Sequence, residues 1–130
     1  MFDLGAQSPQ GALKAGWTAT VVDYALAGGW LFDGTMLVVG DAAGGLFAFD
    51  EATGVPKWQR HNIHNGGLLA VDLHPHGPRI ATAGQDGCVL VWDAGAAEIH
   101  WSMELGKGWV DNLAWSPDGQ WLAASIGRRV

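Results

Sequence analysis

The sequence predicts an all-β protein made of repeated units, each with four short antiparallel strands, that pack side by side. Three observations lead to this prediction: short apolar runs separated by turn residues, a self-similarity with a period of about 43 residues, and a high content of glycine and tryptophan, with 20 and 8 residues. Glycine supplies tight turns, and tryptophan supplies large side chains to bury between strands. No stretch shows a sustained helical period, so helices are not expected.

The overall composition is that of a folded domain. The chain has 130 residues, of which 48% are hydrophobic and 15% charged, enough for one domain with a buried core. Its net charge is -6 and it has no basic block, so we expect no binding to nucleic acid or to anionic membrane surfaces. No apolar run approaches about 18 residues, and the first residues lack the pattern of a secretion signal, so we expect a cytoplasmic protein.

Cysteine and histidine residues do not form the pattern of a metal or redox site. The single cysteine, Cys88, lies inside an apolar run, where a free thiol usually behaves as a small hydrophobic residue. Of the five histidines, His61 and His64 are three residues apart, and His74 and His76 flank a proline. A metal site needs three or four convergent ligands, and these residues fall in different turns. We therefore expect no metal ion and no cofactor.

The repeat is visible when the sequence is compared with itself. At an offset of 43 residues, four identities share one register. They are Gly34 with Gly77, Gly44 with Gly87, Asp50 with Asp93, and Trp58 with Trp101. A third copy begins at an offset of 42, where Pro75 and Gly77 match Pro117 and Gly119. A fixed period of this length is typical of architectures in which each repeat is one supersecondary unit.

Each unit divides into four strand-forming runs. They lie near residues 25–31, 35–40, 45–49 and 55–60 in the first unit, and near 68–74, 79–83, 88–92 and 98–103 in the second. Pro56 falls in a fourth run and removes a ladder hydrogen bond, which a sheet edge tolerates best, so the fourth strand is expected on the outside. The two middle strands are apolar on both faces. Such a sheet must be covered twice, and stacking of the units achieves this.

The end of the second unit carries a recognisable signature. Residues 84–93 read GQDGCVLVWD, a turn followed by an apolar strand that closes with Trp-Asp. This unit resembles the repeats of the WD-repeat β-propeller family, which have about 40–45 residues and four strands per blade. The resemblance implies a partial propeller of about two and a half blades, with blades at residues 21–60 and 61–103 and an incomplete blade at 104–130. Residues 1–20 form an N-terminal segment in this interpretation, with a possible ring-closing strand near 13–20.

The resemblance also implies a hydrogen-bonded tetrad in the second unit. Its members are His64 before the first strand, Thr82 in the second strand, Asp86 in the next turn and Trp92 at the end of the third strand. A buried indole offers one N–H and no acceptor, so it needs an oxygen partner such as a threonine hydroxyl. The same residue types can form a proton relay or a catalytic triad. Here they link strands of one unit and leave no nucleophile free, which favours a structural role.

The other two units depart from this tetrad. The first has Val21, Val39, Ala43 and Phe49 at the four places, and the third has Gly106, Ala124 and Arg128 at the places that it reaches. These units are expected to depend on apolar packing alone. Residues 44–59, GGLFAFDEATGVPKWQ, also resemble the repeat of quinoprotein-type propellers. That second resemblance leaves open an alternative function as a quinoprotein-like enzyme or a ligand-binding propeller.

The expected function rests on the resemblance, because the sequence contains no phosphate loop, no Gly-x-Ser-x-Gly and no paired zinc cysteines. The WD-repeat resemblance implies a non-catalytic scaffold that binds a protein partner on the face formed by the loops before the first strand and between the second and third. The residues at these places are Tyr24, Asn65, Gln85, Lys107 and Trp109. Exposed aromatic side chains anchor many interfaces. Ordinary packing at the end of a blade is the alternative for the tyrosine and the tryptophan.

The resemblance covers residues 13–130 but only part of a ring, since closed propellers have about four blades or more. We therefore expect either a fragment of a longer propeller or a chain that associates with copies of itself through exposed blade faces. Blade faces left uncovered would otherwise promote aggregation.

Overall fold

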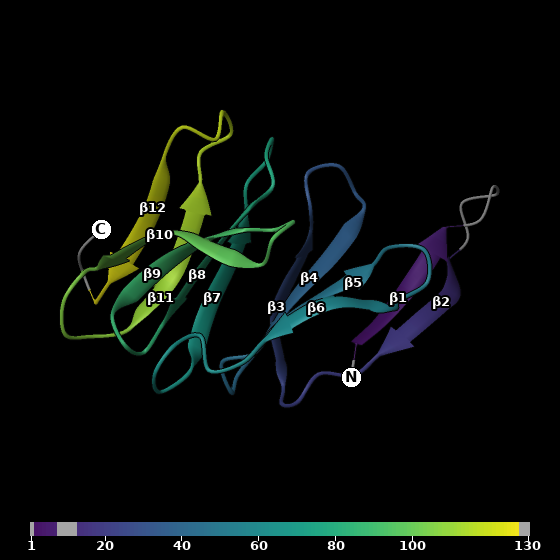
Figure 1. The fold of residues 1–130 in the computed structure, drawn as a ribbon, viewed down its shortest axis with the longest axis horizontal. Helices are drawn as coiled ribbons and strands as arrows, with labels where there is room; N and C mark the ends of the chain where they lie inside the picture. Colours follow the sequence, from purple (N-terminus) through teal and green to yellow (C-terminus); the bar gives the residue numbers. More distant parts are fainter. Residues whose placement is uncertain (1, 8–12, 128–130) are drawn as a thin grey trace.

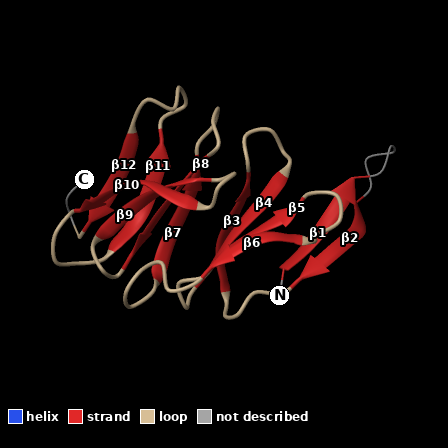
Figure 2. Cartoon of the chain, in the orientation of Figure 1, coloured by secondary structure: helices blue, strands red, loops and turns tan. Residues whose placement is uncertain are grey.

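The computed structural model describes residues 2–7 and 13–127, and within them it consists of strands and turns (Figure 2). Twelve described strands form four antiparallel sheets, two with four strands and two with two strands. The described residues include no helix long and apolar enough to cross a membrane. The prediction of an all-β fold is confirmed.

Two four-stranded sheets, named unit 1 and unit 2, form the middle of the molecule. Unit 1 contains β3 (Ala25–Trp30), β4 (Met36–Asp41), β5 (Leu46–Asp50) and β6 (Pro56–Arg60). Unit 2 contains β7 (Leu68–Leu73), β8 (Arg79–Gly84), β9 (Cys88–Asp93) and β10 (Glu98–Glu104). Strands in each sheet are in chain order, so the fourth strand lies at an edge and accommodates Pro56, as predicted.

A two-stranded sheet lies at each end of this pair. Unit 3 contains β11 (Val110–Trp115) and β12 (Leu122–Ile126), and the N-terminal hairpin contains β1 (Phe2–Gln7) and β2 (Leu13–Ala19). The strand expected near residues 13–20 is therefore present as β2. It pairs with β1, which the sequence analysis did not predict, and not with unit 3.

The four sheets follow one another along the long axis of the molecule. Figure 1 shows the N-terminal hairpin, unit 1, unit 2 and unit 3 in chain order. The first strands make the contacts between units, since β3 contacts β7 and β7 contacts β11. This is the side-by-side arrangement of blades in a β-propeller, and the sheets do not close into a ring.

The middle strands are buried on both faces, and two successive residues of β4 show how. Val38 belongs to the core between units 1 and 2, together with Ile80, whereas Val39 belongs to the core between unit 1 and β2, together with Phe49 and Ala19. Side chains of a strand alternate between the faces of the sheet, so neighbouring valines enter separate cores. A third core between units 2 and 3 contains Ala83, Val89, Val110 and Ile126. Each apolar face of the middle strands is thus covered by a neighbour.

Candidate functional site

The structure brings the four predicted tetrad residues into one chain of hydrogen bonds. The Trp92 indole Nε1 donates to Thr82 Oγ1 at 3.0 Å, and Thr82 Oγ1 lies 2.9 Å from His64 Nε2. On the other side of the ring, His64 Nδ1 lies 3.0 Å from Asp86 Oδ1. Trp92, Thr82 and His64 are buried, so the chain of hydrogen bonds lies inside unit 2 and links β9, β8 and the loop before β7.

The direction of these hydrogen bonds follows from what each group can donate. An indole N–H can only donate, so the Thr82 oxygen accepts from Trp92 and its own proton is free for His64 Nε2. His64 then accepts at Nε2 and donates from Nδ1–H to the Asp86 carboxylate. In this assignment every buried donor of the chain of hydrogen bonds has an acceptor.

Asp86 is the end of the chain and also fastens the turn between β8 and β9. Its carboxylate accepts from the backbone amides of Asn65 and Cys88, each at 3.1 Å. Burial acts to raise the pKa of Asp86, but the hydrogen bonds from the His64 ring and from the two amides outweigh it, so the pKa lies below the ordinary value of 3.8. The ionised Asp86 carboxylate, which lies in the turn between β8 and β9, therefore binds both the loop before β7 and the start of β9.

Cys88 lies beside this turn and is half-buried. Burial, followed by the carboxylates of Asp86 and Glu104, raises the pKa of the Cys88 thiol above its ordinary value. A raised pKa keeps the sulfur protonated at neutral pH, where the protonated form is a poor nucleophile.

Unit 1 contains a buried carboxylate that the sequence analysis missed. Asp41, the last residue of β4, is fully buried, and its carboxylate accepts from the amides of Gly45 at 2.8 Å and Asp23 at 3.0 Å. Gly45 corresponds to Cys88 of unit 2, which lies one repeat of 43 residues later. The Gly45 amide is bound by Asp41, which lies two residues before Ala43, the position where the repeat alignment places the turn aspartate. The expectation that unit 1 depends on apolar packing alone is therefore wrong.

Unit 3 has none of the tetrad residues at the described places, which are Gly106 and Ala124; Arg128 lies outside the described residues. A polar contact holds this unit to unit 2. The backbone N–H of Trp115 donates to the Asp72 carboxylate at 2.8 Å, and the Trp115 indole donates to the Asp72 carbonyl at 3.2 Å. Unit 3, like unit 1, therefore does not depend on apolar packing alone.

The histidines of the turn after β7 also contact unit 3. His74 Nε2 lies 2.9 Å from the carbonyl of Gly119, and His76 Nε2 lies 2.6 Å from the carbonyl of Pro117. His61 instead contacts Gln59 of its own unit, at 3.2 Å. No group of three potential metal ligands occurs among residues 2–7 and 13–127.

The segment that resembles quinoprotein repeats forms the turn between β5 and β6. The Asp50 carboxylate accepts from the amides of Ala52 and Thr53 and from the Thr53 hydroxyl, and the two amides are the main cause of its lowered pKa. The last residue of the pattern, Trp58, donates its indole N–H to the carbonyl of Ala94 in unit 2 at 2.9 Å. The polar groups of this pattern thus bind protein atoms within and between units.

The five residues expected to face a partner lie on connections at one end of the strands. Tyr24 precedes β3, Asn65 precedes β7, Gln85 lies in the turn between β8 and β9, and Lys107 and Trp109 precede β11. Figure 1 shows these connections along the lower edge of the molecule. Tyr24 and Trp109 are 84% and 58% exposed, Asn65 and Lys107 are exposed, and Gln85 is half-buried.

Backbone hydrogen bonds hold these connections in place, and we call the set of connections that carries Tyr24, Asn65, Gln85, Lys107 and Trp109 the loop edge. In unit 1 the Ala42 amide donates to the Tyr24 carbonyl at 2.9 Å. In unit 2 the Gln85 amide donates to the Gly67 carbonyl at 3.0 Å. The connection to unit 3 begins with Leu105, whose amide donates to the carbonyl of Gly87 at 2.8 Å. The loops are therefore fixed relative to the sheets.

Four-stranded antiparallel units that lie side by side, each face covered by the next unit, define a repeat protein of the β-propeller class. The family model described as "WD domain, G-beta repeat" matches residues 57–93 and 101–129, together about half of the chain. The chain belongs to this WD40 repeat family.

Known proteins of similar sequence or structure are consistent with that assignment. The chain is 33% identical over 70 residues to "Small ribosomal subunit protein RACK1" of Schizosaccharomyces pombe, which covers 54% of this chain and 22% of that protein. It is 37% identical over 60 residues to "Guanine nucleotide-binding protein subunit beta" of Arabidopsis thaliana, which covers 46% of this chain and 16% of that protein. The β-propeller domain of Cps50 (Swd1) from Myceliophteria thermophila superposes with a TM-score of 0.72 at 16% identity, over 83% of this chain and 34% of that one. The chain thus spans a small part of each of these proteins.

Proposed function

We propose that the protein is a non-catalytic scaffold that binds a protein partner on its loop edge. The observation that carries this proposal is the exposure of two aromatic side chains, Tyr24 and Trp109, on loops that are fixed to rigid sheets. Large amphipathic rings that are already ordered lose little conformational entropy on binding and are frequent interface anchors.

The relatives support the same class of function. Their printed names describe components of larger assemblies, a small ribosomal subunit and a guanine nucleotide-binding protein. Since the chain spans 22% and 16% of these two relatives, their partners are not transferred to it. A cytoplasmic location is part of the proposal and rests on the composition of the sequence.

The polar residues of the loop edge suggest how a partner would be oriented. Lys107 is an exposed cation beside Trp109, in a chain whose net charge is -6. Asn65 and Gln85 present amide groups that can donate and accept hydrogen bonds. We infer that the aromatic rings supply most of the binding energy and that the lysine and the amides fix orientation.

The test is a comparison of partner recovery by three variants. Trp109→Ala and Tyr24→Ala each remove an aromatic ring of the loop edge. Trp121→Ala is the matched control, because Trp121 is 74% exposed but lies in the turn between β11 and β12, at the other end of the strands. Each tagged variant is incubated with cell extract, and the bound proteins are quantified by mass spectrometry against the wild type.

We expect a set of proteins that the wild type and Trp121→Ala retain and that both loop-edge variants lose by at least about tenfold. All variants should keep the circular dichroism spectrum and melting temperature of the wild type, since the rings are exposed. Equal recovery by all four proteins contradicts the proposal. Unfolding of either loop-edge variant also contradicts it, because the ring would then serve packing at the end of a blade.

A further inference from the structure

We propose that Asn65 on the loop edge is a site of spontaneous modification, at which its side-chain amide is converted to a carboxylate through a cyclic imide formed with the backbone nitrogen of Gly66. Water is the only other reactant. The reaction needs no partner, so the inference stands or falls separately from the scaffold function.

The turn that carries Asn65 requires a glycine after it. Asn65 and Gly66 are the two central residues of a turn that the Gly67 amide closes on the His64 carbonyl at 3.3 Å. Gly66 has a φ of 92°, in the range that favours glycine, and a β-carbon there would lie 3.2 Å from Gln85 Oε1. The same glycine leaves its own backbone nitrogen accessible, because it has no side chain to shield that atom.

The peptide unit between Asn65 and Gly66 can rotate within the turn. In the part of the chain that the structure describes, neither the Asn65 carbonyl nor the Gly66 N–H has a hydrogen-bond partner. The groups on either side are held, since the Asn65 N–H donates to the Asp86 carboxylate at 3.1 Å and the Gly67 carbonyl accepts from the Gln85 amide at 3.0 Å. Turns of types I and II differ in the orientation of the central peptide and share the closing hydrogen bond. Rotation therefore brings the Gly66 nitrogen to the Asn65 side chain without the loss of a hydrogen bond.

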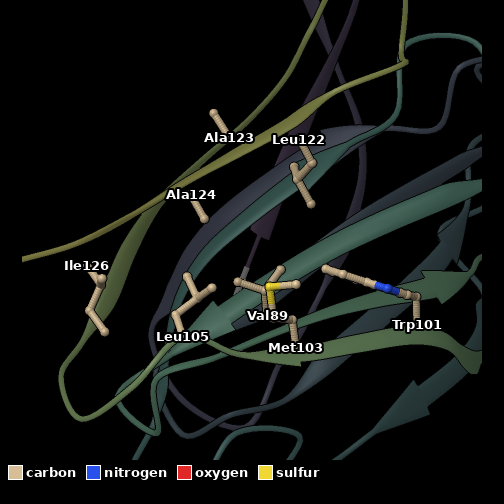
Figure 3. Close-up of a pocket in the computed structure, with 8 residues that line it drawn as sticks. All are labelled: Val89, Trp101, Met103, Leu105, Leu122, Ala123, Ala124 and Ile126. Carbon is tan, nitrogen blue, oxygen red and sulfur yellow. The ribbon is translucent and has the colours of Figure 1, made fainter. Parts of the chain in front are cut away.

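The side chain of Asn65 is open to the water that the reaction consumes. Asn65 is exposed, and its side-chain amide makes no hydrogen bond to any residue that the structure describes. An enclosed apolar site would exclude water. An apolar hollow of about 450 Å³ does occur in the molecule, between unit 2 and β12 (Figure 3), but none of its lining residues belongs to the loop that carries Asn65.

The other two asparagines of the chain lack these conditions. Asn62 is exposed, but the next residue is Ile63, whose β-branched side chain crowds its own nitrogen and whose N–H donates to the Gly44 carbonyl at 3.0 Å. Asn112 donates its side-chain amide to the preceding carboxylate at 3.2 Å and lies in the ladder between β11 and β12. Asn65 alone combines an exposed, unpaired amide with a following glycine nitrogen.

The reaction balances with water as the only added reagent. In the first step the Gly66 nitrogen attacks Cγ of Asn65, so a bond forms between these atoms and the bond from Cγ to Nδ2 breaks. The side-chain nitrogen leaves as ammonia and takes up the proton that the Gly66 nitrogen gives up. In the second step water adds to one of the two carbonyl carbons of the imide, the bond from that carbon to the Gly66 nitrogen breaks, and the nitrogen regains a proton from the water.

The carbon that water attacks decides the product. Opening at Cγ gives aspartate, and opening at the main-chain carbonyl carbon gives isoaspartate, in which the backbone runs through the former side chain. In both products the new carboxyl group is ionised at neutral pH.

Either product changes the loop edge. A carboxylate only accepts hydrogen bonds, whereas the amide that it replaces also donates. The new charge lies on the residue whose N–H binds the Asp86 carboxylate. Isoaspartate also lengthens the main chain by a methylene group between the hydrogen bonds at Asn65 and Gly67. The effect on a partner rests on the proposed function, in which the Asn65 amide helps to orient that partner.

The test follows the three asparagines while the full, folded chain is kept at physiological pH and temperature. Samples are digested at acidic pH, and each asparagine-containing peptide is quantified by liquid chromatography with mass spectrometry. We expect Asn65 to be converted at least about tenfold faster than Asn62 and Asn112, with aspartate and isoaspartate both present. The rate should rise with pH, because the attack requires loss of the Gly66 proton. Asn65→Gln is the matched control, since it keeps an amide but needs a larger ring, and we expect it to remain unmodified over the same time.

Three outcomes overturn the proposal. The first is conversion at Asn65 that is no faster than at Asn62 or Asn112. The second is conversion of the same peptide at the same rate in Asn65→Gln, which would place the reaction at another residue. The third comes from a repeat of the time course in urea, where the chain is unfolded. We expect the folded and unfolded rates at Asn65 to agree within about tenfold, and a folded rate lower than that would show that the turn holds the Gly66 nitrogen away from the side chain.

Discussion

At the scale of single residues, the buried polar side chains of this fold occur in groups in which each side chain has a hydrogen-bond partner. The Thr82 hydroxyl accepts from Trp92 and faces His64, so all three buried groups have partners. In unit 1 the places of Thr82 and Trp92 are taken by Val39 and Phe49, which have no polar groups to satisfy. A network that lacks one member is less stable than either the complete network or an apolar core. A buried polar group without a partner has lost its hydrogen bonds to water and gained none in the protein.

Removal of the central hydroxyl should therefore be costly. We expect Thr82→Val to lower the free energy of unfolding by about 2–4 kcal/mol, because the Trp92 indole and one nitrogen of His64 lose their partner in a buried place. Thr82→Ser keeps the hydroxyl and loses one methyl group, so we expect a loss of about 1 kcal/mol. Urea unfolding followed by circular dichroism measures both. Equal destabilisation by the two substitutions would show that the hydrogen bonds contribute nothing beyond packing.

Asp86 should make the stability of the protein depend on pH. Its pKa is lower in the folded chain than the ordinary 3.8, so the ionised carboxylate stabilises the fold above that value, and the contribution is lost as the pH falls through the folded-state pKa. We expect Asp86→Asn to be less stable than the wild type at pH 7 and the difference to shrink below about pH 4. Thermal unfolding from pH 7 to pH 3 measures this. A difference that stays constant over the range contradicts the argument.

At the scale of the element, each sheet depends on its neighbour for both apolar and polar contacts. The Asp72 side chain on β7 accepts from the backbone of Trp115 on β11, and its carbonyl accepts from the indole. One residue of unit 2 thus holds the strand that begins unit 3. Val110 on β11 adds the apolar part of the contact through the core shared with Ala83 and Val89.

Loss of this carboxylate should loosen unit 3 and leave unit 2 folded. We expect Asp72→Ala to increase the exchange rates of amides in β11 and β12 by at least about tenfold, with little change in β8 and β9. Asp111→Ala is the control, because Asp111 is an exposed acid on β11. Hydrogen exchange with mass spectrometry provides the measurement. The account is wrong on this point if both variants change β11 and β12 equally.

At the scale of the whole molecule, the sequence predicted most of the architecture because the signals are periodic. The eight strands of units 1 and 2 begin and end within one residue of the predicted bounds. Gly and Asp residues mark the turns, and the apolar runs identify the buried strands, so each unit could be delimited locally. The stacking of units followed from strands that are apolar on both faces.

The features that were missed depend on contacts between distant residues. The strand β1 has the sequence FDLGAQ, whose glycine and polar residues give a weak strand signal, and it forms by pairing with β2. Asp41 was missed because alignment by position points to Ala43, whereas in space the aspartate reaches the same amide from two residues earlier. An aspartate at the end of an otherwise apolar strand is the signal that could have identified it.

The central claim is that each unit is stable only against a neighbouring unit, since its middle strands are apolar on both faces. The most direct test compares the full chain with unit 2 alone, residues 61–104, by far-UV circular dichroism and urea unfolding. We predict a β-sheet spectrum and a cooperative transition for the full chain, and an unfolded spectrum without a transition for the isolated unit. Cooperative unfolding of residues 61–104 alone, from a native-like β-sheet spectrum, would contradict the account.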